Sequence, residues 1–133
     1  MIRKIRHIGI AVEDLEEGIH LYRDVLGLEF LGTEEVLDQK VRVAMFGVGE
    51  VRIELLEPMS DESPIAVHLA KKGAGMHHIC YEVDDVAESL KEYEDKGVRL
   101  IDKAPRAGAE GMQIGFLHPK STGRVLVELN SKG

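Results

Sequence analysis

Two histidines and two glutamates occupy matching places in this 133-residue chain: His7, His78, Glu54 and Glu128. The histidines open two similar apolar segments, and the glutamates lie in two segments that alternate like strands. Imidazole nitrogens and carboxylate oxygens together suit a divalent first-row metal ion, with positions left for water or substrate. A single strand histidine is more commonly a hydrogen-bonded structural residue. Four such side chains at repeated positions favour a metal site.

The matching places come from an internal repeat. The segment His7–Asp14 reads H-I-G-I-A-V-E-D, and His78–Asp85, seventy-one residues later, reads H-I-C-Y-E-V-D-D. Each final aspartate is followed after three residues by a glutamate, a pattern typical of a helix N-terminus. Apolar residues at helical spacing follow, and Gly27 and Gly97 are placed to end the helices.

Each repeat therefore predicts a strand, a helix and further strands. We expect an α+β fold of two βαβββ modules, forming a cupped mixed sheet with helices outside. The first helix is expected over 14–26, a polar loop over 33–40, and later strands over 41–48, 51–56, 98–101, 113–117 and 124–129. We expect a single domain over 1–133, with module 1 at about 1–58, a linker and short helix at 59–74, and module 2 at about 75–133.

Composition narrows the classes of function. The net charge of −7 without a basic cluster argues against nucleic acid, and no apolar run approaches the roughly 20 residues of a membrane span. The one cysteine, Cys80, is read as a small core residue and suits a reducing compartment. We therefore expect a cytoplasmic protein.

Several segments make the chain similar to methylmalonyl-CoA epimerases of the vicinal-oxygen-chelate (glyoxalase) superfamily. They are H-I-G-I-A-V-E-D-L at 7–15, E-L-L-E-P at 54–58, S-P-I-A at 63–66, G-A-G-M-H-H-I at 73–79, F-L-H-P-K-S at 116–121 and G-R-V-L-V-E-L at 123–129. The resemblance implies His7, Glu54, His78 and Glu128 as metal ligands, with Gln in some members where Glu54 stands. It also implies interconversion of (2R)- and (2S)-methylmalonyl-CoA.

The implied chemistry begins with removal of the C2 proton, which lies between a thioester carbonyl and a carboxylate. A cation would stabilise the resulting enolate, and Glu128 is placed to act as the base. Members of the family often carry a second base on the third strand, where this chain has Val43. Glu34, Glu35 or Asp38 could replace that base, or Gln39 could orient a water molecule.

Two other functions stay open. Glyoxalase I, a lactoylglutathione lyase, uses a His-Glu-His-Glu ligand set, but does not typically carry the S-P-I-A and H-P-K-S segments. A non-enzymatic binding module of the same fold would typically lack the four ligands.

Further expectations concern the ligand, the metal and assembly. Cobalt, manganese, nickel and zinc ions all suit two nitrogen and two oxygen ligands. Lys120 and Gln39 are the candidate substrate-binding residues, and the loop from Arg106 to Gly111 is a weaker candidate. The resemblance also points to a homodimer, since sheet edges and helix faces of such modules commonly pack across a two-fold axis.

Overall fold

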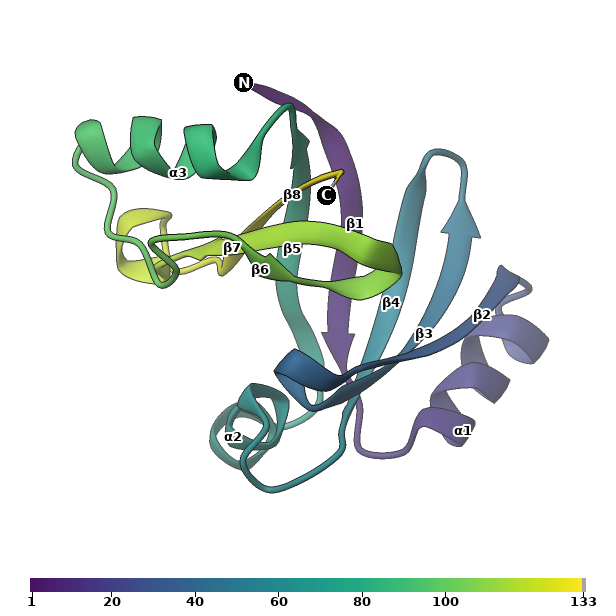
Figure 1. Ribbon diagram of the computed structural model, residues 1–133. Coiled ribbons are helices and arrows are strands. Elements are labelled where there is room, and N and C mark those ends of the chain that lie inside the picture. The colour runs from purple at the N-terminus through teal and green to yellow at the C-terminus, as the bar shows by residue number, and fades with distance from the viewer. Residues whose placement is uncertain (133) are drawn as a thin grey trace. The chain divides into compact units, whose positions relative to one another are not determined.

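The structure is a computed structural model that describes residues 1–132 (Figure 1). These residues form two compact units. The first unit covers His7–His77, and the second combines residues 1–6 with the chain from His78 onward. Strand β1 (Ile2–Ala11) passes through both units. The predicted α+β class with two βαβββ modules is confirmed, whereas a single domain over 1–133 stays a prediction.

The first unit is built from one βαβββ repeat and one additional helix. After β1 come α1 (Leu15–Ile19), the π-helical segment η1 (His20–Val25), β2 (Glu29–Val36), the 3₁₀ turn η2 (Leu37–Gln39), β3 (Val41–Val48), β4 (Val51–Pro58) and α2 (Pro64–Lys72). The strand order is β2-β3-β4-β1. β1 runs parallel to β4, and the other pairs are antiparallel.

One face of this sheet packs against α1. Its buried core consists of Leu15, Ile19, Ala44, Phe46 and Leu55. Because side chains alternate along a strand, the residues between these core positions point to the other face. That other face carries the candidate ligands of the first unit.

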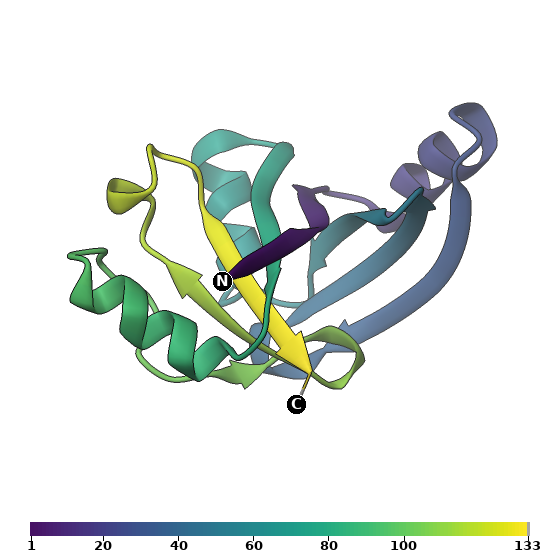
Figure 2. The same ribbon diagram turned by 90° about the horizontal axis from the view of Figure 1, so that it is seen from above.

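The second unit repeats the arrangement. It contains β5 (Gly75–Val83), α3 (Val86–Asp95), β6 (Arg106–Ala107), the 3₁₀ turn η3 (Ala109–Gly111), β7 (Met112–Leu117), the 3₁₀ turn η4 (Pro119–Ser121) and β8 (Val127–Lys132). The strand order is β1-β5-β8-β7-β6, and β5 runs parallel to β8. Helix α3 covers one face of β7 and β8 (Figure 2), where Val83, Val86, Leu90, Leu117 and Leu129 form the core.

The helix starts follow the sequence signals. Asp14 accepts a hydrogen bond from the Glu17 backbone N–H at 3.1 Å, and Asp85 accepts one from the Glu88 N–H at 3.1 Å. Each bond satisfies an amide that the helix itself leaves without a partner. Gly27 and Gly97 have φ angles of 79° and 88°, a conformation that glycine adopts without steric cost. No helix within residues 1–132 is long and apolar enough to cross a membrane.

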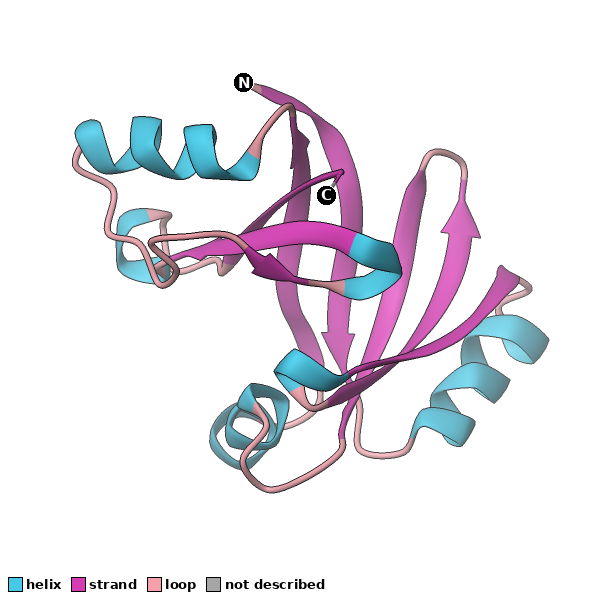
Figure 3. Ribbon diagram, viewed as in Figure 1, coloured by secondary structure: helices cyan, strands magenta, loops and turns pink. Residues whose placement is uncertain are grey.

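The first helix differs from the expected 14–26 segment. It is α-helical only to Ile19, and the helical ribbon then continues as the wider turns of η1 (Figure 3). The Leu26 N–H donates to the Leu21 carbonyl, five residues earlier, at 2.8 Å. The wider turns change the angular spacing of side chains. Leu26 continues the apolar helical spacing of Leu15, Ile19 and Tyr22, but after these wider turns it is 56% exposed.

Three other boundaries were predicted wrongly. The loop expected at 33–40 is limited to η2, because residues 33–36 extend β2 at the edge of its sheet, where polar outer residues are tolerated. The last strand begins at Val127 rather than at Arg124, whose φ of 71° and bond to the Pro119 carbonyl keep it in the turn. Residues 98–101 form only an isolated bridge at Leu100, and β6 is the paired strand instead.

Candidate metal-binding site

In the first unit, His7 and Glu54 come together on the sheet face away from α1. Glu54 lies between Ile53 and Leu55, which both pack in the α1 core, so its own side chain must point to the opposite face. His7 Nδ1 lies 3.3 Å from Glu54 Oε2, and both residues are only 6% exposed. A buried imidazole and carboxylate in contact offer one nitrogen and one oxygen of the types that bind metal ions.

In the second unit, His78 and Glu128 form the corresponding pair. His78 Nε2 lies 2.8 Å from Glu128 Oε1, with exposures of 4% and 5%. Glu128 lies between Val127 and Leu129, which pack against the α3 core. The second unit thus supplies a further nitrogen and a further oxygen of the same chemical types.

The two pairs share one backbone register. In the first unit Gly9 lies beside Glu54, and in the second Cys80 lies beside Glu128. The histidine of each pair is therefore two residues before the strand neighbour of its glutamate. In parallel strands, residues two apart share a face, so the same offset brings each imidazole to its carboxylate. The sequence repeat predicted equivalent positions; the register gives the geometric reason.

Two neighbours of the second pair, Cys80 and Phe116, were not predicted from the sequence to lie at the candidate site. Cys80 is fully buried, on the same face as His78, and its sulfur lies within 4.8 Å of a Glu128 carboxylate oxygen. Phe116 lies beside Glu128 in β7, and its ring meets the His78 ring edge to face at 5.8 Å. The Cys80 thiol thus lies beside the candidate ligands. The prediction that Cys80 is only a small core residue is therefore incomplete. The strand alternation that places His78 also places Cys80 and could have shown this.

A second row of side chains follows on the same face. In the second unit this row contains Asn130, then Ile114 on β7 and Arg106 on β6. Asn130 is 4% exposed, and its Oδ1 has no hydrogen-bond partner among residues 1–132. Arg106 Cζ lies 5.6 Å from the Phe116 ring centre, and Arg106 Nε lies 3.4 Å from Asp102 Oδ1. Polar groups therefore continue outward from the His78–Glu128 pair.

The predicted substrate-binding residues lie on turns. Gln39 is half-buried at the end of η2, where its backbone carbonyl accepts a bond from Ser63 Oγ at 3.3 Å. Lys120 is exposed on η4, and its backbone N–H donates to His118 Nδ1 at 3.1 Å. Loss of hydration, followed by the charges of Arg99 and Lys120, lowers the pKa of His118. The η4 turn therefore presents the Lys120 cation beside the His118 imidazole.

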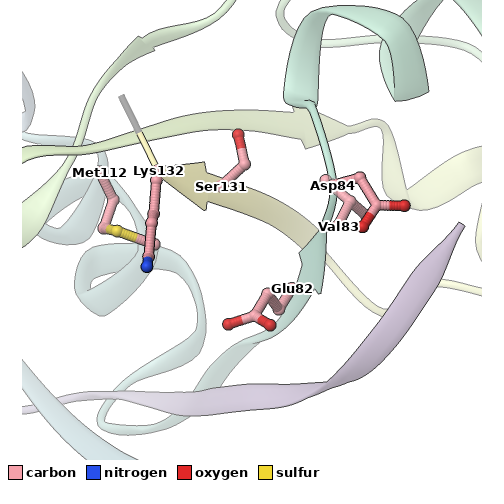
Figure 4. Close-up of a pocket in the computed structure, with 6 residues that line it drawn as sticks. All are labelled: Glu82, Val83, Asp84, Met112, Ser131 and Lys132. Atoms are coloured by element: carbon pink, nitrogen blue, oxygen red, sulfur yellow. The ribbon is translucent and has the colours of Figure 1, made fainter.

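A pocket of about 200 Å³ lies further along the second unit's sheet, lined by Glu82, Val83, Asp84, Met112, Ser131 and Lys132 (Figure 4). Two of its polar groups, those of Asp84 and Ser131, have structural partners. Arg3 donates two hydrogen bonds to Asp84, at 2.8 and 3.2 Å, and these bonds lower the pKa of Asp84. Ser131 Oγ accepts the first N–H of α3 at 3.2 Å. These groups secure the start of α3 and the start of β1.

Known proteins resemble this chain over nearly its full length. The uncharacterized protein YqjC of Bacillus subtilis is 45% identical over 96% of this chain and 91% of that protein. The mitochondrial methylmalonyl-CoA epimerase of Dictyostelium discoideum is 41% identical, over 98% of this chain and 80% of the enzyme. A structure of methylmalonyl-CoA epimerase in complex with methylmalonyl-CoA and NH4+ superposes with a TM-score of 0.95 at 39% identity, covering 100% of this chain and 96% of that one.

The family model of the Glyoxalase/Bleomycin resistance protein/Dioxygenase superfamily matches residues 6–116. That match spans most of the described chain and includes both candidate histidines. The chain therefore belongs to this superfamily and is a homologue of methylmalonyl-CoA epimerases.

Proposed function

We propose that this protein interconverts (2R)- and (2S)-methylmalonyl-CoA, using one divalent metal ion held by His7, Glu54, His78 and Glu128. The observation that supports this most strongly is the buried His–Glu pair in each unit, built on the same strand register. Full-length similarity to methylmalonyl-CoA epimerases selects this reaction among those of the superfamily.

The donor set fits a first-row divalent ion. Two imidazole nitrogens and two carboxylate oxygens are compatible with cobalt, manganese, nickel or zinc. A bound ion of this kind supplies positive charge that stabilises an enolate developing on the substrate's thioester oxygen. The buried surroundings of the four side chains strengthen such electrostatic effects relative to water.

Glu128 is the proposed base for one proton transfer. Its carboxylate is buried beside His78, at 2.8 Å, and a carboxylate at this place is the group that we propose receives a proton from the substrate's C2. Burial of Glu128 excludes water that would compete for the enolate. Return of a proton to the opposite face of C2 inverts the centre. That return needs a second proton donor.

Lys120 is the proposed contact for the anionic coenzyme A portion. It lies on an exposed turn with Arg99 close enough to affect the same imidazole. A cation at such a turn attracts phosphate groups. Replacing Lys120 by alanine should raise KM severalfold without a comparable change in kcat. Unchanged values of both would remove Lys120 from the substrate site.

We also propose a homodimer. The chain exposes apolar side chains in and beside η1, with Leu21 45%, Val25 64% and Leu26 56% exposed. Exposed apolar groups of this kind commonly lie at interfaces. Light scattering at micromolar concentration should give twice the mass of the 14.8 kDa chain. A monomer mass would reject the proposal.

The central test is a coupled epimerase assay on metal-free protein, with cobalt, manganese, nickel and zinc ions added back separately. Activity should be absent without metal and return with at least one ion. The hemithioacetal of glutathione serves as the competing substrate. Turnover of that compound without turnover of methylmalonyl-CoA would assign the site to a lactoylglutathione lyase instead. Turnover of neither would leave a binding protein.

A further inference from the structure

The position that commonly carries the second base in related enzymes is here a buried aliphatic residue. Val43, on β3, is 2% exposed and offers no group that exchanges protons. Its neighbours on the same face are equally unable to do so, because Val41 and Met45 are also apolar and buried. The second proton donor must therefore come from another strand or turn.

Glu34 lies directly opposite Val43. Strand β2 pairs with β3 in an antiparallel register that sets Glu34 beside Val43 and Val36 beside Val41. Directly opposed residues of an antiparallel pair project from the same face of the sheet. Val43 in turn lies beside Leu56, two residues after Glu54 on β4. Glu34 is thus on the face that carries His7 and Glu54.

The other acidic groups near this position are excluded by their placement. Glu35 lies opposite Arg42, and Arg42 reaches to Glu57, whose carboxylate caps α1 at the Leu15 N–H. Glu35 therefore belongs to the face that packs on the helix. Asp38 is exposed in the η2 turn, beyond the end of the strand. Glu34, in contrast, is half-buried within the strand.

A strand irregularity gives Glu34 this orientation. Phe30 pairs with Phe46 on the α1 face, but the register then shifts, so that Gly32 pairs with Met45 on the opposite face. Without the extra residue, strict alternation would place Glu34 on the same face as Phe30. The bulge therefore turns the following residues of β2 towards the ligand-bearing face.

The distance is compatible with the same task. Neighbouring strands are about 4.8 Å apart, so the Glu34 backbone is one strand spacing further from β4 than the Val43 backbone. The two methylene groups of a glutamate span much of that spacing. The Glu34 side chain therefore projects beside that of Val43, from the same face of the sheet.

We propose that Glu34 is the second acid–base group of the epimerase, replacing the function that Val43 cannot provide; this rests on the proposed function. In one direction Glu128 accepts the C2 proton, and protonated Glu34 gives its proton to the opposite face of C2. The C2–H bond to the first proton breaks and a new C2–H bond forms, with no net change in charge. Exchange of both carboxyl groups with water restores the starting state. In the other direction the roles are reversed.

The test compares Glu34→Gln with Glu35→Gln, the adjacent residue on the opposite face. Epimerisation should fall by about 100-fold or more in Glu34→Gln, the usual contribution of a general acid or base. Glu35→Gln should stay within about twofold of the parent, since surface changes of this kind have small effects. Metal content and the circular dichroism spectrum should be unchanged in both variants.

Deuterium uptake from D₂O, followed separately from each epimer, identifies the step that is lost. Glu34→Gln should still exchange the C2 proton of the epimer that Glu128 deprotonates, and should lose exchange from the other. Equal epimerisation by Glu34→Gln and the parent, or equal loss of exchange from both epimers, would overturn the role of Glu34. An inactive parent protein would instead overturn the proposed function itself.

Discussion

The two units use one scaffold for the candidate ligands but differ in the next row of the sheet. In both, a histidine precedes by two residues the strand neighbour of a glutamate. The following row contains Leu56, Val43 and Glu34 in the first unit. The equivalent row contains Asn130, Ile114 and Arg106 in the second. The row of candidate ligands is therefore duplicated. The outer row ends in an acidic residue, Glu34, in the first unit and in a basic residue, Arg106, in the second.

This difference separates two physical requirements. The proposed metal ion would need the same donor types at the same offset in both units. The strand pairs β1–β4 and β5–β8 have the same register, which gives each histidine that offset from its glutamate. The proposed substrate has two chemically different ends, so its contacts need not be the same in the two units. Edge strands β2 and β6 are paired on one side only, so they accommodate charged residues without burying them fully. The acidic residue Glu34 and the basic residue Arg106 thus both lie on edge strands.

Removing a ligand histidine from either unit should have the largest effect. His78→Ala and His7→Ala should each lose bound metal and epimerase activity together, because each removes one of the two imidazole ligands of the proposed four-ligand site. Elemental analysis and the coupled assay measure the two losses. His20→Ala is the matched control, since His20 is exposed on η1 and its imidazole pairs with Asp24 at 3.0 Å. Full metal content in His78→Ala would show that His78 is not a metal ligand and that the two units do not contribute equivalent ligands.

The two glutamates should respond differently to the same change. Glu54→Gln should retain metal and lose no more than about tenfold in activity, about 1.4 kcal/mol, because an amide oxygen can still coordinate. Glu128→Gln should lose about 1,000-fold, because the amide cannot accept the C2 proton. Deuterium exchange from each epimer, with metal content determined in parallel, distinguishes a lost base from a lost ligand. Normal exchange from both epimers in Glu128→Gln would reduce Glu128 to a ligand.

Replacing Arg106, which lies in the second unit, should have a smaller effect on the kinetic constants. Arg106→Ala should raise KM by about tenfold with a smaller change in kcat, because its cation lies one row beyond Glu128 and beside Phe116. Arg106→Lys should recover only part of this loss, since lysine keeps the charge but not the planar donor arrangement. A Lys variant as poor as the alanine variant would show that charge is unimportant there. Unchanged kinetics in both would separate Arg106 from the substrate.

The smallest effect should be the same in both units. Asp14→Ala and Asp85→Ala each remove an N-cap bond of 3.1 Å, which should cost about 1 kcal/mol of unfolding free energy. Urea denaturation measures this cost. Metal content should be unchanged, because both caps lie at the far ends of the ligand strands. A much larger loss at one cap would show that the two helices contribute unequally to their cores.

Much of this protein was determined by local sequence patterns. The repeat around His7 and His78, the period-two alternation around Glu54 and Glu128, and the caps at Asp14 and Asp85 are all short-range signals. Each depends on a few adjacent residues, so the sequence alone predicted two modules and placed each candidate ligand on its correct strand face. The helix after Ile19 was less predictable, because apolar spacing does not distinguish an α-helical turn from a wider one.

The tertiary structure decided how those local pieces meet. The two-residue offset between each histidine and its glutamate depends on pairing between strands that are far apart in the sequence. The face on which Glu34 lies depends on the bulge between Phe30 and Gly32. One extra residue reverses every side chain that follows. Gly32, with a φ of 123°, lies beside the inserted residue, but a single glycine in the sequence does not fix the register of the strand. Pairing with β3 supplies this information, because buried Val36 and Val41 must share a face.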